Sequence, residues 1–257
     1  MRPPLESLVS IDGTTGYLRL AALVVGLALL AALVNRVGRL DHAGAALRAA
    51  GRATIQLAAV GVVIAAVLAS WWLTAGFVLL MLTVASLTAG RRMTRDRSLW
   101  WAAAAVWAGA GPVSALLLAS GLIPLRPVAV VPVLGILIGG AMTATVLAGR
   151  RSLDALQGRH GEYEAALSLG LLERDAAMLV ARPDASLALL PGLDQTRTVG
   201  LVTLPGAFVG MLLGGATPLQ AAAVQLLVLV ALLLVQSISV TVTVELIARR
   251  MLARSGR

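Results

Sequence analysis

The sequence predicts an all-α membrane protein with seven transmembrane helices, and three observations lead to that fold class. Hydrophobic residues make up 59% of the 257 residues and charged residues only 13%, far from the balance of a soluble domain. Long apolar runs recur along the chain, each close to the roughly 20 residues that a helix needs to cross a bilayer. The runs are continuous and do not alternate as the wall of a β-barrel would.

The expected spans follow one another closely and leave no room for a separate soluble domain, so residues 1–257 are interpreted as one seven-span membrane domain. The last apolar run, from Pro218 to Ala248, is longer than a bilayer crossing requires, which places Glu245 at or beyond the interface. The sixth run contains Pro205, which predicts a break in that helix. The expected spans are about 17–35, 53–70, 73–90, 99–120, 127–149, 198–215 and 218–244.

The distribution of arginine predicts the orientation. Arginine supplies all 21 basic residues, and nearly all of them lie in alternate connectors. Only Arg2, Arg19 and Arg126 fall on the opposite side. The positive-inside rule then predicts an outer N-terminus and a cytosolic C-terminus, in a bacterial cytoplasmic membrane. The same rule accounts for the net charge of +9 through membrane lipid, without a nucleic-acid partner.

Missing residue types exclude most catalytic classes. Cysteine is absent, which excludes thiolate metal sites and cysteine nucleophiles. Lysine is also absent, so the chain contains no phosphate-binding loop of the G-x-x-x-x-G-K-[ST] type and no retinal Schiff base. Both histidines, His42 and His160, lie in connectors. We therefore expect no enzyme activity and no cofactor, and any metal ligands stay unknown.

Polar groups inside the expected spans are candidates for a transport pathway, because polar side chains in a bilayer face protein or water. They could equally well only bond neighbouring helices. Glycine stripes on the fifth span (Gly135, Gly139) and the sixth (Gly206, Gly210, Gly214) predict that these two helices pack closely. The pathway candidates are Gln56, Met142, Thr143, Pro205, Gln225 and Gln236.

The longest polar stretch lies between the fifth and sixth spans, at about 150–197, and is called the coupling segment below. Within it, Glu164, Ala165 and Ala166 are followed four residues later by Gly170. This spacing resembles the EAA loop of ATP-binding-cassette importer permeases, a short cytosolic helix that docks on a separate ATPase subunit. A short helix that ends at a glycine suits such docking physically. Arg182 stands where the motif has leucine.

Longer runs are similar to one family, the FetB-like permeases of bacterial iron exporters, whose plant relatives are linked to aluminium tolerance. The runs are Arg52–Leu57, Met142–Ala144, Leu167–Gly170 and Thr198–Gly206. The resemblance implies a seven-span permease that forms a homodimer and pairs with a separately encoded ATPase. Ala207, Phe208 and Val209 stand where the family usually has two methionines, and Gly140 replaces an expected asparagine, which puts iron itself in doubt.

The sequence thus predicts the permease subunit of an ATP-binding-cassette transporter, with iron or another metal ion as its cargo. In this interpretation the coupling segment transmits the work of the partner ATPase to the sixth span. A stand-alone secondary transporter or channel for a small polar solute is the main alternative, although the spans hold no deeply placed acid or histidine for proton coupling. A membrane scaffold or sensor is the other. The sequence does not give the direction of transport.

Overall fold

The computed structural model describes residues 13–94 and 100–253, and this part of the chain is helical throughout, apart from short connectors and one isolated bridge between Val199 and Thr203. Seven helices among the described residues are long and apolar enough to cross a membrane. The predicted all-α, seven-span class is therefore confirmed. The long helices are α1 (Gly13–Val37), α2 (Ala43–Ala69), α3 (Trp71–Met93), α4 (Trp101–Ala119), α5 (Pro127–Gly158) and α10 (Pro218–Ala248); the shorter ones are α6 (His160–Ser168), α7 (Glu173–Ser186), α8 (Leu190–Thr198) and α9 (Gly206–Leu213).

The chain divides into two compact units, residues 1–67 and 68–257. The described part of the first unit consists of α1 and most of α2, joined by a short connector in which Arg39 and Asp41 adopt positive φ angles. The second unit contains every other helix. The interpretation of the whole chain as one domain stays a prediction.

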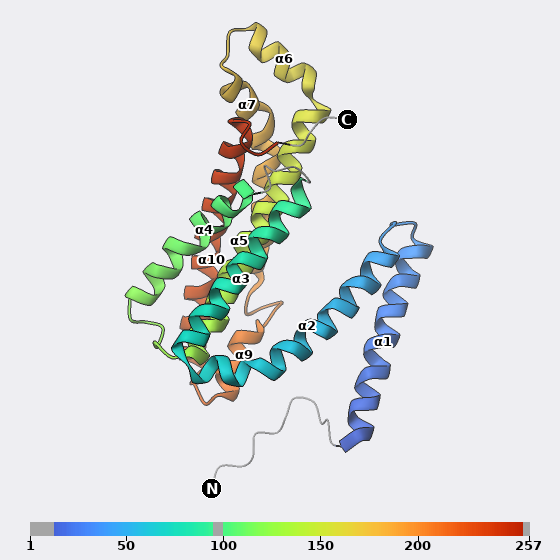
Figure 1. Ribbon diagram of the computed structural model, residues 1–257, viewed down its shortest axis with the longest axis vertical. Helices are drawn as coiled ribbons and strands as arrows, with labels where there is room; N and C mark the ends of the chain where they lie inside the picture. The colour runs from blue at the N-terminus through green and yellow to red at the C-terminus, as the bar shows by residue number, and fades with distance from the viewer. Residues whose placement is uncertain (1–12, 95–99, 254–257) are drawn as a thin grey trace. The chain divides into compact units, whose positions relative to one another are not determined.

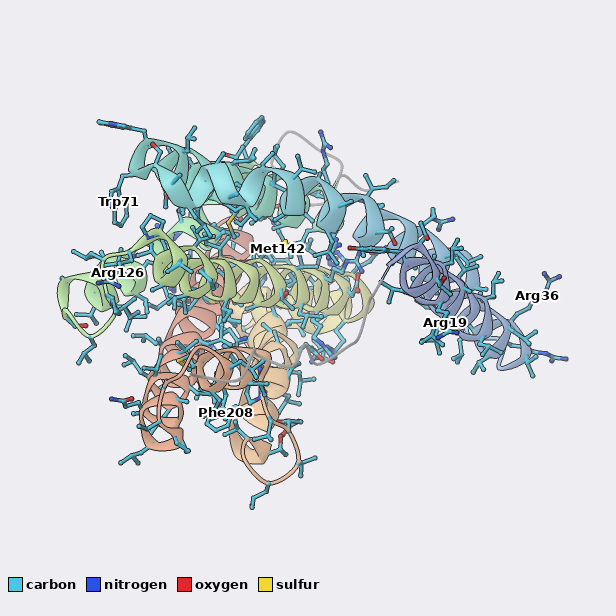
Figure 2. The ribbon with its side chains drawn as sticks, turned by 90° about the horizontal axis from the view of Figure 1, so that it is seen from below. Arg19, Arg36, Trp71, Arg126, Met142 and Phe208 are labelled. Carbon is cyan, nitrogen blue, oxygen red and sulfur yellow. The ribbon has the colours of Figure 1, made fainter. Side chains whose placement is uncertain are left out.

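The core of the second unit is built by α3, α4, α5 and α10, which lie side by side as a bundle (Figure 1). Trp71 and Arg126, at the starts of α3 and α5, lie at the same end of this bundle, so the two helices run in the same direction (Figure 2). The backbone of α4 lies close to α10 at Gly109. A methyl group there would come within 2.8 Å of the Val235 carbonyl oxygen, so only glycine fits.

A second apolar cluster joins α5, α6, α7 and α10 at the opposite end of the bundle. Alanine dominates this cluster, and small side chains let helix backbones approach closely. Ala144 and Ala148 of α5, Ala176 and Ala177 of α7, and Ala248 of α10 are all buried in it. The first part of α7 is therefore packed firmly against both long helices.

The sixth crossing differs from the expected helix over 198–215. The chain runs through α7, a 3-10 turn at Leu187–Leu189 and α8, leaves helical geometry at residues 199–205, and becomes helical again only in α9, which has 8 residues. Gly200, with a φ of +84°, and Pro205, which precedes the first residue of α9, explain the break. By length and composition, Glu173–Thr198 is the sixth candidate span.

The expected close pairing of the glycine stripes on the fifth and sixth spans is wrong within a single chain. A methyl group added at Gly139, Gly206 or Gly210 would meet nothing within 4 Å, and α9 packs against α10. Gly135 of the fifth-span stripe instead lies against α3, where an added methyl group would come within 2.9 Å of the Met81 side chain. A periodic stripe shows which residues share a face but not which neighbour that face meets.

Candidate functional site

The helix α6 presents one face to the protein and the other to its surroundings. Tyr163 and Ala166 are buried against α7, whereas Glu164 and Ala165 are exposed. The Glu164 carboxylate lies 3.3 Å from Nε2 of His160, one turn earlier on the helix. Both of these side chains are about two-thirds exposed, so the contact leaves the carboxylate accessible to another molecule.

Gly170 ends α6 in a conformation that needs glycine, with a φ of +88°. The N–H of Gly170 donates to the Leu167 carbonyl, and the N–H of Leu171 donates to the Ala166 carbonyl, which is the Schellman arrangement of a helix C-terminus. The turn that results holds Leu169 and Leu172 outward, 83% and 73% exposed. Both leucine side chains therefore project into the surroundings near the exposed Glu164.

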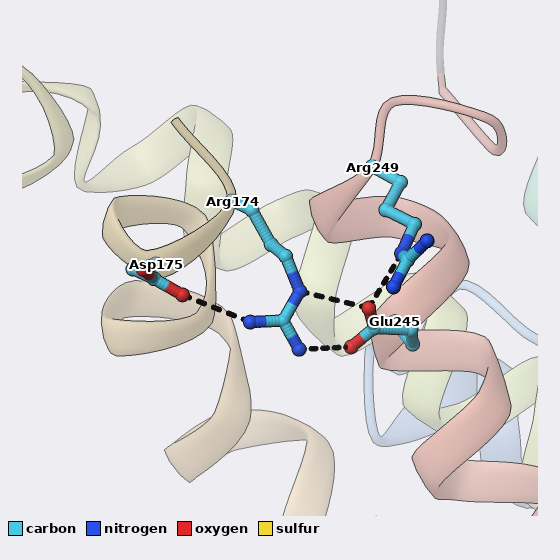
Figure 3. A network of polar contacts seen from close by, with 4 residues as sticks. All are labelled: Arg174, Asp175, Glu245 and Arg249. Atoms are coloured by element: carbon cyan, nitrogen blue, oxygen red, sulfur yellow. Dashed lines mark hydrogen bonds and ion pairs between the residues drawn. The ribbon is translucent and has the colours of Figure 1, made fainter. Parts of the chain in front are cut away.

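An ion-pair network joins the start of α7 to the end of α10 (Figure 3). The guanidinium of Arg174 donates two hydrogen bonds to Glu245, with distances of 2.8 and 2.7 Å from Nε and Nη2 to the two carboxylate oxygens. Arg249 donates a further bond of 2.6 Å to the same carboxylate, and Asp175 accepts one from Arg174. This paired, two-point geometry fixes orientation as well as distance. The four residues are called the α7–α10 clasp below.

A second set of polar contacts holds the rest of the coupling segment in place. Nη2 of Arg250 donates to the Tyr163 hydroxyl of α6, and Nε of Arg250 lies 3.5 Å from a carboxylate oxygen of Glu173. Bonding to Tyr163, together with the nearby Glu173 charge, raises the pKa of Arg250 above its ordinary value. Arg159, between α5 and α6, donates to Asp184 and to the Val180 carbonyl of α7. The whole segment is thus tied to α5, to α10 and to the residues that follow α10.

The structure places the predicted pathway residues in different environments. Gln225 and Gln236 of α10 are more than nine-tenths buried, and Oε1 of each has no hydrogen-bond partner among the described residues. Met142, labelled in Figure 2, is half-buried on α5, and the exposed Thr143 donates to the Gly139 carbonyl of its own helix. Pro205 precedes α9. Gln56 is exposed on α2, in the first unit, and stays a prediction.

The carboxamide of Gln236 packs directly against α8. A methyl group at Gly192 would come within 1.9 Å of Gln236 Oε1, and one at Gly140 of α5 within 3.7 Å of its Nε2. Gly192 therefore leaves room for the carboxamide between α8 and α10. The coupling segment contacts α10 at two levels, at Gln236 through Gly192 and at Glu245 through Arg174.

Several of these features could not be predicted from the sequence. Glu245 was expected only to lie near an interface, and its partner Arg174 is distant in the sequence, so no local pattern signals the clasp. Gly192 follows a proline in a polar stretch and resembles a loop residue. The exposed Leu169 comes directly before Gly170, and the exposed Leu172 follows two residues after it. Leucines on both sides of a helix-ending glycine were the signal that could have identified them.

Together, these features define a multi-pass helical membrane protein that has a structured segment at one end of its bundle. The chain belongs to the family described as "Uncharacterised protein family (UPF0014)", whose model matches residues 18–252. Its relatives are named as membrane proteins, and one of them as a probable iron export permease.

The relatives come from bacteria and plants. The chain is 31% identical to the probable iron export permease protein FetB of Escherichia coli strain K12, over 89% of this chain and 90% of that protein. It is 36% identical to the UPF0014 membrane protein STAR2 of rice, covering 81% of this chain and 73% of STAR2. With the protein ALUMINUM SENSITIVE 3 of Arabidopsis thaliana it shares 33% identity, over 81% and 77% of the two chains. No solved structure matches the chain.

Proposed function

We propose that this chain is the membrane-spanning permease subunit of an ATP-binding-cassette transporter in a bacterial cytoplasmic membrane, exporting iron or another metal ion. A separate ATPase subunit supplies the energy, and two copies of the chain form the translocation unit. The observation that carries the proposal is α6, a short helix that exposes Glu164 and ends at Gly170. The name of the FetB relative supports iron as the cargo.

The docking surface comprises Glu164, Ala165, Leu169 and Leu172. Exposed leucines on a turn that also carries charged groups suit a protein partner, because an apolar knob with a polar rim is the usual anatomy of an interface. The sequence contains no lysine, so it has no phosphate-binding loop of the kind in which a lysine contacts the nucleotide phosphates. The hydrolysis must therefore take place on another chain.

The proposed route of transmission leads from the coupling segment to the sixth span, and the structure adds α10 as a second recipient. The start of the sixth candidate span, α7, is packed against α5 and α10 and is held to α10 by the clasp. A push on α6 and α7 is thus delivered first to α10. The interrupted sixth crossing, which is covalently continuous with α7, follows this movement through Gly192 and Gln236.

A matched pair of charge reversals tests the docking surface. Glu164 and Glu162 both lie on α6 and are similarly exposed, 66% and 61% at their side chains, but only Glu164 belongs to the proposed surface. The chain is co-expressed with a candidate ATP-binding-cassette ATPase from the same genome, purified through a tag on the permease, and assayed for bound ATPase and for ATP hydrolysis. Glu164→Arg should lower ATPase retention at least about tenfold, a change of about 1.4 kcal/mol.

Glu162→Arg serves as the control and should retain the ATPase, because only the weak exposed pair with Arg159 is lost. Leu172→Asp should behave like Glu164→Arg. Equal retention of the ATPase by wild type, Glu164→Arg and Leu172→Asp would remove α6 as the docking element. No co-purifying ATPase from the wild-type chain would contradict the proposed function itself.

A further inference from the structure

Three arginines gather where the end of α3 meets α5. The two helices lie side by side (Figure 1), and an added methyl group at Gly149 of α5 would collide with the sulfur of Met93, the last residue of α3. At the same level, Nε of Arg150 donates a hydrogen bond of 2.8 Å to the Arg92 carbonyl oxygen. Arg91, Arg92 and Arg150 are all exposed. These three residues are called the arginine patch below.

The face of α3 that carries Arg92 is the face that borders α5. Met81 lies about three helical turns before Arg92 on that face, since three turns of a helix take about 11 residues. A methyl group at Gly135 of α5 would come within 2.9 Å of the Met81 side chain. Arg92 and Arg150 therefore lie on the two sides of one seam between the helices, and Arg91 lies next to that seam on α3.

The spacing along α3 places the arginine patch at a membrane interface. Trp72, which is 88% exposed, and Arg92 are separated by about 30 Å of helix, which matches the thickness of the hydrocarbon core. Trp100 and Trp101, at the start of α4, are exposed as well, and the connector that follows Thr94 is too short to cross the bilayer. Exposed tryptophans are typical of the headgroup level, so these two lie at the same interface as the patch.

The length of α5 indicates the same level independently. Arg126, which precedes its first residue, lies at the same end of the bundle as Trp71 (Figure 2), and Arg150 follows about 36 Å along the helix, a length that suits a tilted crossing. The helix continues to Gly158, about 12 Å beyond Arg150, before α6 begins. The headgroup layer on one side of a bilayer is only about 5–8 Å thick. The arginine patch thus lies at headgroup depth, and α6 lies beyond it.

The arginine patch has no carboxylate to neutralise it within the described part of the chain. None of its three members forms an ion pair there, and Asp154, one turn beyond Arg150 on α5, is not paired with Arg150. Farther along the chain, five arginines each lie within 3.7 Å of a carboxylate: Arg159, Arg174, Arg197, Arg249 and Arg250. The arginines at headgroup depth are therefore the ones left for an external anion.

The chemistry of the arginine patch suits a phosphate group. Because the Arg150 side chain reaches the backbone of Arg92, two like charges lie together at the interface, and their repulsion disfavours this arrangement unless an anion screens it. Arg150 uses Nε for the Arg92 carbonyl, which leaves the N–H groups on Nη1 and Nη2 without a partner among the described residues. A guanidinium fork matches the paired oxygens of a phosphate, and anionic phospholipids present phosphates at this depth.

We propose that the arginine patch binds the phosphate group of an anionic phospholipid, held at the seam between α3 and α5. The depth of the patch favours lipid over a protein partner, because the proposed docking surface on α6 lies beyond the headgroup layer. The lipid connects the end of α3 to the helix that leads into α6, and so stabilises the base of the coupling segment. This site is separate from the proposed transport function and does not depend on it.

Native mass spectrometry of the purified, delipidated chain tests the site. The chain is titrated in detergent with phosphatidylglycerol, which is anionic, and with phosphatidylcholine, which carries the same phosphate beside a positive charge. Wild type should bind one phosphatidylglycerol at least about tenfold more tightly than phosphatidylcholine, because basic residues near the surface attract anionic lipid. Arg92→Gln combined with Arg150→Gln should weaken phosphatidylglycerol binding at least about tenfold and leave phosphatidylcholine binding unchanged.

Three further variants separate the site from a general effect of charge or folding. Arg197→Gln is the control, since it removes the same charge from an arginine that lies 3.6 Å from Asp194, and it should bind phosphatidylglycerol as well as wild type. Arg92→Lys with Arg150→Lys keeps both charges but loses the forks, so its affinity should be intermediate. Arg91→Gln covers the case in which the double glutamine variant does not fold. It should weaken binding by itself, because this exposed side chain has no partner among the described residues.

The outcomes that would overturn the assignment are distinct. Equal affinity of wild type for the two lipids would do so, as would equal affinity of wild type and the double glutamine variant for phosphatidylglycerol. Displacement of the lipid by a large excess of inorganic phosphate would make the patch a site for a soluble anion instead. Glutamine variants that keep the lipid but lose a co-purifying ATPase would assign the patch to a protein interface.

Discussion

Breaking the α7–α10 clasp should uncouple ATP hydrolysis from transport. Arg174 and Glu245 share two hydrogen bonds of 2.8 and 2.7 Å, and their side chains are 44% and 27% exposed. A fully exposed pair contributes about 0.2–1 kcal/mol. Charge-assisted bonds contribute about 1.5–3 kcal/mol where water is excluded. Because water reaches both side chains, the two-point geometry predicts a coupling energy that is measurable but smaller than that of a pair shielded from water.

A double-mutant cycle measures that energy directly. The free energy of unfolding of the purified chain is determined in detergent for wild type, Arg174→Ala, Glu245→Gln and the double variant, with circular dichroism as the signal. Arg174→Lys keeps the charge but cannot make both bonds, so it should recover less than half of the loss. Arg182→Ala, at an exposed arginine of the same helix, is the control and should change little.

The functional readout separates a coupling role from a purely structural one. In the complete transporter, Glu245→Gln should lower the amount of cargo moved per ATP hydrolysed at least about threefold while the ATPase remains bound. A coupling energy below about 0.3 kcal/mol, together with an unchanged ratio of transport to hydrolysis, would refute the reasoning. A chain that is destabilised but transports with the normal ratio would reduce the clasp to a structural contact.

The remaining predictions concern orientation, packing and the end of α6. Reporter fusions at Ser120 and Gly215 should give outside signals and a fusion at Ser168, at the end of α6 and before the sixth candidate span, an inside signal; a cytosolic signal at Gly215 would contradict the predicted orientation. Gly109→Ala should lower the free energy of unfolding by about 1–3 kcal/mol, because its methyl group meets the Val235 carbonyl at 2.8 Å, whereas Gly111→Ala meets nothing within 4 Å and should be neutral or stabilising. Gly170→Ala should cost about 1–2 kcal/mol through its φ of +88°, and equal stability in denaturant would show that α6 ends in another way.

The class of fold was predictable from the sequence because each membrane span is a continuous local run of apolar residues. A run of apolar residues specifies a crossing wherever it occurs, which explains why the number of spans was predicted correctly. The helix at His160–Ser168 and its end at Gly170 were equally local, since a glycine with positive φ is a common helix terminator. Features that depend on three to five neighbouring residues could thus be predicted directly from the sequence.

The contacts between helices could not be read in this way. The stripe at Gly206 and Gly210 was expected to meet the fifth span, but neither glycine has a neighbour within 4 Å of an added methyl group, whereas Gly109 and Gly192, which belong to no stripe, make close contacts. The Arg174–Glu245 pair joins positions that are far apart in the sequence, and nothing near either residue indicates the other. The break at residues 199–205 was foreseen from Pro205, but its length was not, because Gly200 extends it upstream.

Inside-out vesicles show whether a partner ATPase drives transport by this chain. Vesicles are prepared from cells that co-express the chain with a candidate ATP-binding-cassette ATPase from the same genome, and radioactive iron and ATP are added outside. Iron should enter the vesicles only with ATP, and an ATPase lacking its phosphate-loop lysine, or a permease carrying Glu164→Arg, should abolish the uptake. Iron uptake that proceeds equally without ATP, or with the inactive ATPase, would show that the chain does not depend on ATP hydrolysis by a partner.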